Sequence, residues 1–174
     1  MTAVTITHAS TPDDIAEVRT LFLEYAASLG FSLCFQGFDA ELAELPGAYA
    51  PPEGRLLLAR VDGVAAGCVG LRPIGDGSCE MKRLFVRPDF HGQGLGRRLA
   101  TAVVDEGRAA GYTAMRLDTV PSMKAAIGLY SSLGFRDIPP YRENPIEGHA
   151  TWSCGWRDPL RHDDPSAPDW WRSL

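Results

Sequence analysis

The feature that most constrains the fold is a glycine-rich turn that joins an apolar run to an amphipathic run. The apolar run, residues 84–86, suits a buried strand, and Pro88 ends it because proline has no N–H for a central sheet ladder. Apolar residues then recur at helical spacing from Leu95 to Ala110. Between the two runs lie three glycines: Gly92, Gly94 and Gly96. Such a turn gathers unpaired N–H groups at a helix N-terminus, which predicts a site for a phosphate or pyrophosphate.

The elements on both sides of this turn predict one mixed α/β domain. Periodicity, caps and turn signals favour a strand, a helix, a short helix, a three-stranded meander, a helix, a strand, a helix and two strands. The expected elements span residues 4–7, 12–29, 38–45, 55–61, 64–71, 78–86, 95–110, 114–120, 121–133, 135–138 and 149–156. The strand over 114–120 follows a helix, so it should run parallel to the strand before that helix.

The chain length suits a single well-buried domain. It has 174 residues, of which 45% are apolar and 22% charged, as in an ordinary globular protein. We expect this domain to span residues 1–156. Residues 157–174 are rich in Asp, Pro and Arg and predict an extended C-terminal arm. Trp170 and Trp171 in this arm are expected to dock on the domain or on a second subunit.

Charge and cysteine usage argue against several classes of function. The formal net charge of −5 disfavours a nucleic-acid binder, which needs an excess of Lys and Arg on one face. We expect no membrane partner, because no apolar stretch approaches the ~20 residues of a bilayer span and no signal peptide is evident. The cysteines have no C-x-x-C spacing, which predicts reduced, mostly buried thiols in a cytoplasmic protein.

Three kinds of phosphate-bearing ligand compete for the glycine turn. A dinucleotide site needs G-x-G-x-x-G, and Arg97 or Leu99 stands at the third glycine position in the two possible registers. Asp118, at the end of the next strand, keeps this alternative open as a candidate ribose-binding acid. A P-loop is rejected because no Gly-Lys-Ser/Thr follows. The third candidate is coenzyme A, whose pyrophosphate the turn would hold.

Two motifs resemble the GNAT superfamily of N-acetyltransferases. The stretch 84–99 resembles its acetyl-CoA signature, Gln/Arg-x-x-Gly-x-Gly/Ala, with His91, Gly94 and Gly96 at the three defined positions. His91 departs from the usual Gln or Arg. The stretch 125–135 resembles the family's Ala-x-x-Leu-Tyr-x-x-Leu-Gly-Phe motif. Both motifs occur in this order behind a meander, and the resemblance covers the chain from about residue 4 to residue 156.

The resemblance implies the GNAT fold and its cosubstrate. The fold has a central mixed, mostly antiparallel sheet flanked by helices. The strand before the glycine turn carries a bulge and splays from the next parallel strand, and acetyl-CoA lies in that gap. No metal is required, and the family makes a homodimer the expected assembly.

The resemblance also implies which residues bind acetyl-CoA. Backbone groups of Leu84, Phe85 and Val86 are expected to pair with the acetyl and pantetheine amides. The expected pyrophosphate cradle consists of His91, Gly92, Gln93, Gly94, Leu95, Gly96 and Arg97. The second motif adds Ala125 and Tyr130 to the expected cofactor contacts.

Two side chains are candidates for catalysis. By its motif position, Tyr130 is the expected general acid for the thiolate that an attacking amine expels, with core packing as the other interpretation. Glu80 is the expected base for the protonated amine, or else a solvated charge or a partner of Arg83 or Lys82. By strand alternation, Glu80 shares a face with Lys82, Leu84 and Val86. His149 is a further candidate base.

The acceptor is expected to be a primary amine of a small molecule or a peptide. The resemblance implies that residues 31–49 and 139–149 shape its pocket. They contain the aromatic residues Phe35, Phe38 and Tyr141 and the acids Glu41, Glu44, Glu143 and Glu147. The acids weakly favour a cationic amine, although ionised surface acids are the commoner explanation. The chain is thus interpreted as an N-acetyltransferase, with a noncatalytic acyl-CoA sensor or a dinucleotide oxidoreductase as alternatives.

Overall fold

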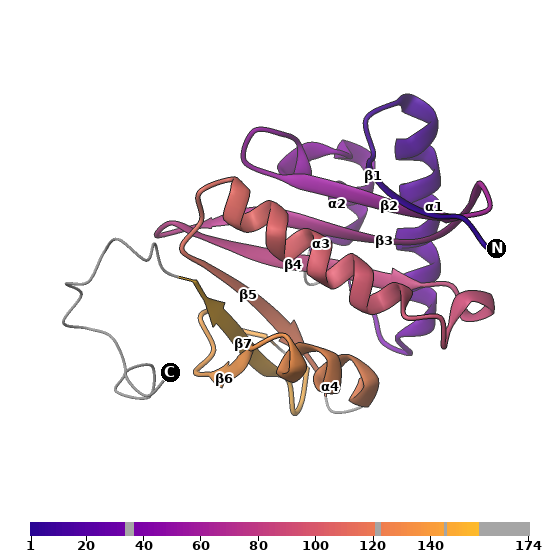
Figure 1. The fold of residues 1–174 in the computed structure, drawn as a ribbon. Coiled ribbons are helices and arrows are strands. Elements are labelled where there is room, and N and C mark those ends of the chain that lie inside the picture. Colours follow the sequence, from indigo (N-terminus) through magenta and orange to yellow (C-terminus); the bar gives the residue numbers. More distant parts are fainter. Residues whose placement is uncertain (34–36, 121–122, 145, 157–174) are drawn as a thin grey trace.

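The computed structural model describes residues 1–33, 37–120, 123–144 and 146–156. Its centre is a seven-stranded sheet in the order β1-β2-β3-β4-β5-β7-β6 (Figure 1). The strands are β1 (Val4–His8), β2 (Arg55–Val61), β3 (Val64–Gly75), β4 (Ser78–Val86), β5 (Ala114–Thr119), β6 (Arg136–Ile138) and β7 (Ala150–Gly155). All neighbours are antiparallel except β4 and β5, which run parallel as predicted.

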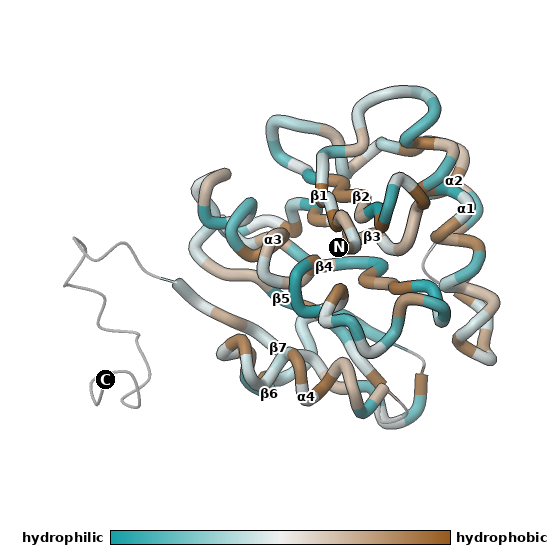
Figure 2. The backbone as a smooth tube through the Cα atoms, turned by 45° about the vertical axis from the view of Figure 1, so that its right-hand side comes forward, coloured by the Kyte–Doolittle hydropathy of each residue, from teal (hydrophilic) through white to brown (hydrophobic). Residues whose placement is uncertain are grey.

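Helices cover both faces of the sheet, and each face has its own core. The helices α1 (Pro12–Ser28) and α2 (Phe38–Glu44) bury Leu21, Phe22 and Phe38 against one face. The helices α3 (Leu95–Ala109) and α4 (Lys124–Ser132) bury Leu99 and Tyr130 within the other cluster. In Figure 2 hydrophobic and hydrophilic stretches alternate along the helices, as one-sided burial requires.

The predicted order of elements and the mixed α/β fold class are confirmed. Helix α1 begins with a capping box formed by Thr11 and Asp14, and Pro12 is its first residue. Two short 3-10 helices, Gly47–Tyr49 and Pro88–Phe90, were not predicted. The C-terminal arm with its two tryptophans, and with it the expected boundary at residue 156, falls outside the described residues, as do Cys34, Phe35 and the first residues of the predicted helix 121–133.

The parallel strands β4 and β5 separate soon after they begin. Their pairing runs from Ser78 opposite Ala114 to Glu80 opposite Arg116. Beyond that point β4 stays paired with β3, up to Val86 opposite Gly67. The edge of β4 that faces β5 therefore lies open over its second half, which agrees with the predicted splay.

A bulge in β4 changes which side chains share a face. The register against β3 shifts between Cys68 and Gly70, and Arg83 adopts φ +58° there. After the shift Leu84 and Val86 pack in the α3 core, on the same face as Cys79 and Met81. The prediction that Glu80 shares its face with Leu84 and Val86 was therefore wrong, because strict alternation does not cross a bulge.

Candidate active site

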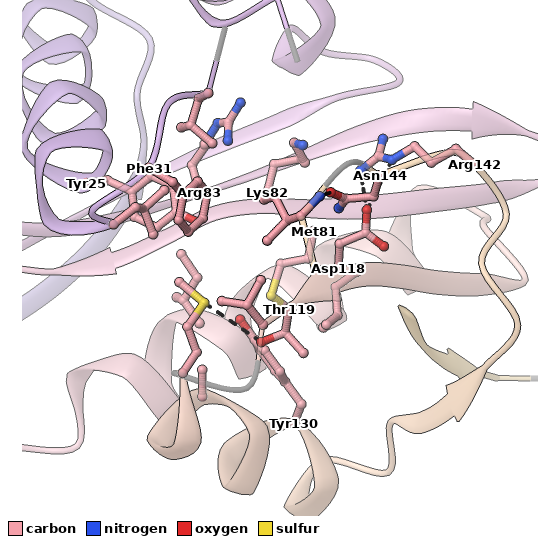
Figure 3. A pocket seen from close by; sticks show the side chains of 18 residues that line it. Tyr25, Phe31, Met81, Lys82, Arg83, Asp118, Thr119, Tyr130, Arg142 and Asn144 are labelled. Atoms are coloured by element: carbon pink, nitrogen blue, oxygen red, sulfur yellow. Dashed lines mark hydrogen bonds and ion pairs between the residues drawn. The ribbon is translucent and has the colours of Figure 1, made fainter. Parts of the chain in front are cut away.

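The pocket of interest lies where β4 and β5 diverge (Figure 3). It encloses about 100 Å³ and draws on five parts of the chain: the end of α1 with residues 29–33, β4, β5, α4 and the segment 142–146. Its lining consists of Tyr25, Leu29, Phe31, Leu33, Met81, Lys82, Arg83, Leu84, Leu117, Asp118, Thr119, Val120, Met123, Ala126, Tyr130, Arg142, Asn144 and Ile146.

One side of this pocket is backbone that suits coenzyme A. Leu84 lines the pocket on the β4 edge that β5 leaves open, and Phe85 and Val86 follow it. The cradle continues into α3, whose N-cap Gly94 makes no side-chain hydrogen bond to the first-turn amides. Those amides and the helix dipole favour a pyrophosphate. The predicted backbone contacts are thus contiguous along one edge.

The glycines of the turn keep that cradle open. Gly92 and Gly94 have φ values of +77° and +73°, which L side chains rarely adopt, and a Cβ built on either meets no atom within 4 Å. A Cβ at Gly96 would meet only Val86, at 3.9 Å. The space that side chains would fill is therefore available to a ligand. Arg97 is exposed in the first turn of α3, where its charge favours a phosphate.

His91, the departure from the family pattern, closes the turn onto the strand. Its Nε2 lies 2.8 Å from the carbonyl oxygen of Val86. Because a carbonyl only accepts, Nε2 carries the proton in this contact. This hydrogen bond therefore ties the end of β4 to the start of the glycine turn.

Tyr130 projects from α4 into the pocket (Figure 3). Its side chain is 8% exposed and its ring packs on Phe135, with centroids 5.8 Å apart. Its hydroxyl makes no hydrogen bond to any residue that the structure describes. Burial, and to a lesser extent Tyr25, raises the pKa of Tyr130, so the hydroxyl keeps its proton at neutral pH. Ala125 is exposed on the same helix, and its neighbour Ala126 lines the pocket instead.

Glu80 is completely buried behind the pocket and does not line it. One of its oxygens accepts from the Tyr141 hydroxyl at 2.8 Å, and the other accepts from Arg72 at 2.9 Å. Arg142 bridges both oxygens. Burial raises the pKa of Glu80, but the neighbouring cations and the Tyr141 hydroxyl outweigh burial, so the net direction is downward. These contacts hold Glu80 as a carboxylate that orients its neighbours.

The sequence placed residues 139–149 at the acceptor pocket but did not single out the residues that form its polar end. We give this name to Lys82, Asp118, Arg142 and Asn144, which gather at one end in Figure 3. Burial lowers the pKa of Lys82 to about 7; the arginines around it act in the same direction, and Glu80 opposes them. The four residues come from β4, β5 and a loop, so no local spacing could have grouped them.

The four acids that the sequence suggested for the acceptor pocket do not line it. Glu41 pairs with the buried Arg83 at 2.9 Å, and Glu44, Glu143 and Glu147 are exposed and absent from the lining. The commoner interpretation, ionised surface acids, fits these three.

Three other residues that the sequence suggested for the site, Phe38, Tyr141 and His149, do not line the pocket either. Phe38 packs under the Arg83 guanidinium, and Tyr141 holds Glu80. His149 contacts the Ile146 carbonyl through Nδ1, at 3.1 Å. Within the described ranges no group of three His, Cys, Asp or Glu side chains is arranged for a metal, and no helix is long and apolar enough to cross a bilayer.

Comparisons with known proteins agree with this geometry. The model of the acetyltransferase (GNAT) family matches residues 18–135. An uncharacterised N-acetyltransferase of Schizosaccharomyces pombe is 41% identical over 145 residues, which cover 82% of this chain and 89% of that protein.

Solved structures share the fold at low identity. An acetyltransferase of Streptococcus agalactiae has a TM-score of 0.72 and 21% identity, covering 88% of this chain and 98% of that one. The PaiA N-acetyltransferase of Thermoplasma acidophilum, solved with coenzyme A, has a TM-score of 0.67 and 15% identity, covering 88% and 99%. The glycine turn follows the fourth strand of this fold, which leaves the dinucleotide interpretation without support. The chain belongs to the GNAT acetyltransferase family.

Proposed function

We propose that this protein transfers the acetyl group of acetyl-CoA to a primary amine by direct attack in a ternary complex. The observation that carries the proposal is the shared pocket, in which Tyr130 faces the open edge of β4 that begins at Leu84. Acetyl-CoA supplies an acetyl group activated as a thioester. The new N–C bond forms as the C–S bond breaks, the amine loses one proton and the thiolate gains one.

The protein's own groups divide this work between backbone and side chain. Backbone amides and carbonyls of residues 84–86 orient the cosubstrate, and the amides of the glycine turn bind its pyrophosphate. Tyr130 donates its proton to the departing thiolate, since its hydroxyl is protonated and makes no bond to the described residues.

The amine must lose its proton before it attacks. Burial, together with the surrounding arginines, lowers the pKa of the Lys82 amine to about 7, and an acceptor amine buried in the same surroundings experiences a shift in the same direction. Glu80 contributes by holding Arg142 and Tyr141 in place. For Glu80 to act directly as the base, Arg142 or Tyr141 must first break its hydrogen bond to a carboxylate oxygen of Glu80.

The test is release of coenzyme A thiol from acetyl-CoA with a broad panel of amines, together with calorimetry of acetyl-CoA binding. We expect micromolar binding and amine-dependent thiol release. Binding without release for any amine would instead favour the noncatalytic sensor. Absence of acetyl-CoA binding would overturn both.

A further inference from the structure

The carboxylate of Asp118 at the polar end and that of Glu80 behind the pocket are already hydrogen-bonded within the protein. Asp118 accepts from Arg142 through one oxygen, at 2.8 and 3.1 Å, and from Thr151 through the other, at 2.9 Å. Glu80 is saturated in the same way by arginine and tyrosine donors. Both acids therefore already accept from donors of the protein. Recognition of a cationic acceptor would need an acid that pairs with its ammonium group instead.

The other three side chains of the polar end, Lys82, Arg142 and Asn144, carry donors. The Oδ1 atom of Asn144 accepts from the Ile146 amide at 3.0 Å, and the Asn144 NH2 donates to no residue in the described ranges. Lys82 lines the same pocket, and Arg142 stays 30% exposed although it pairs with both acids. The arginines around Lys82 add positive charge there, although burial is the main cause of its low pKa.

Apolar side chains line other parts of the same pocket, and Phe31 lies on the side away from Asn144 and Arg142 (Figure 3). Phe31, Leu33 and Ile146 line the same pocket, and Leu33 is 5% exposed. A ligand that fills this space presents an apolar group to these side chains and an anionic group to the donors.

We propose that the acceptor is a primary amine that also carries a carboxylate, such as an apolar amino acid, and that Lys82 and Asn144 bind this carboxylate. The inference rests on the proposed acetyl transfer and adds the substrate class to it. Protonated Lys82 pairs with the carboxylate, while the acceptor amine is left on the side of Tyr130.

Matched amines test the proposal. Leucine, leucinamide and 3-methylbutylamine differ only at the carboxyl group, as do phenylalanine, phenylalaninamide and phenethylamine, while 4-aminobutanoate and butylamine vary the spacing. We expect at least one acid to be acetylated with kcat/KM tenfold or more above its uncharged counterparts. Preference for the amides would point instead to peptide N-termini and overturn the proposal.

Variants of the polar end provide the second readout. Lys82→Met should raise KM for the preferred acid at least tenfold more than it raises KM for the matched plain amine, and Lys82→Arg should restore the preference for the acid. Asn144→Asp should shift preference toward the plain amine. Lys124→Met, an exposed lysine on α4, is the control.

The possible failures are distinguishable. If acetyl-CoA does not bind, the proposed function itself fails. If acetyl-CoA binds and the plain amines react as well as the acids, or no panel member reacts, the carboxylate proposal is overturned while acetyl-CoA binding stands. Equal loss for all amines in Lys82→Met and Asn144→Asp would assign these residues a structural role.

Discussion

The two halves of the proposed site are built from different kinds of group. The half proposed for the cosubstrate is backbone: one strand edge, of which Leu84 lines the pocket, and one helix N-terminus, contiguous between residues 84 and 97. The acceptor half consists of side chains from β4, β5 and the loop 142–146, tied together by a buried ion network. A backbone site tolerates change in most side chains except glycine, whereas a side-chain site fails when a single partner is lost.

Loss of the Glu80 charge should have the largest effect, and it tests whether the acceptor half depends on its ion network. Glu80→Gln leaves Arg72 and Arg142 without their shared carboxylate, so we expect the free energy of unfolding to fall by about 3 kcal/mol. Urea denaturation measures this. Glu106→Gln, which breaks a partly exposed pair with Arg55, should cost less than about 1 kcal/mol. Equal costs would contradict a special role for the network.

Tyr130 lies where the two halves meet. Tyr130→Phe removes only the hydroxyl, so kcat should fall about 100-fold at neutral pH while the Kd of acetyl-CoA stays within threefold. Stopped-flow thiol detection measures the rate. Tyr112→Phe, whose hydroxyl contacts the Glu53 carbonyl instead, should keep the wild-type rate. An unchanged kcat in Tyr130→Phe would remove Tyr130 as the acid.

The backbone half can be broken at a single glycine. Gly94→Val sets a β-branched residue at φ +73° and fills the cradle, so the Kd of acetyl-CoA should rise about 30-fold, or about 2 kcal/mol. Gly111→Val is the matched control, because Gly111 has φ +88° and equally open surroundings at the far end of α3. It should lose stability without losing affinity. Equal losses of affinity in the two variants would show that strain alone is responsible.

The smallest effect is a pH dependence of stability from Lys82. Its pKa falls from 10.5 to about 7 on folding, so the unfolded chain binds more protons between these values and stability rises with pH across that window. The slope for one full proton is roughly 1.4 kcal/mol per pH unit. Denaturation of wild type and Lys82→Met from pH 7 to 9 should show this slope only in wild type. Parallel curves would contradict a low pKa for Lys82.

The same comparison explains what the sequence could predict. The cosubstrate half was foreseeable, because glycines, a strand and a helix start are signals carried by neighbouring residues. The resemblance implied a bulge in this strand but not its position at Arg83, since a positive φ on arginine has no local signature. The bulge places Leu84 on the opposite face from the one expected. For the acceptor half the ranges 31–49 and 139–149 were expected, but its ion network was missed, because Asp118 and Arg142, 24 residues apart, meet only after β5 and the loop are in place.

The division of the proposed site is tested most directly by amide hydrogen exchange with and without coenzyme A. We predict that coenzyme A slows exchange at residues 84–86 and 92–97, where backbone groups bind it, and leaves residues 142–146 unchanged. Slowed exchange in the groove between residues 8–12 and 45–51, with no change at 84–97, would contradict the assignment.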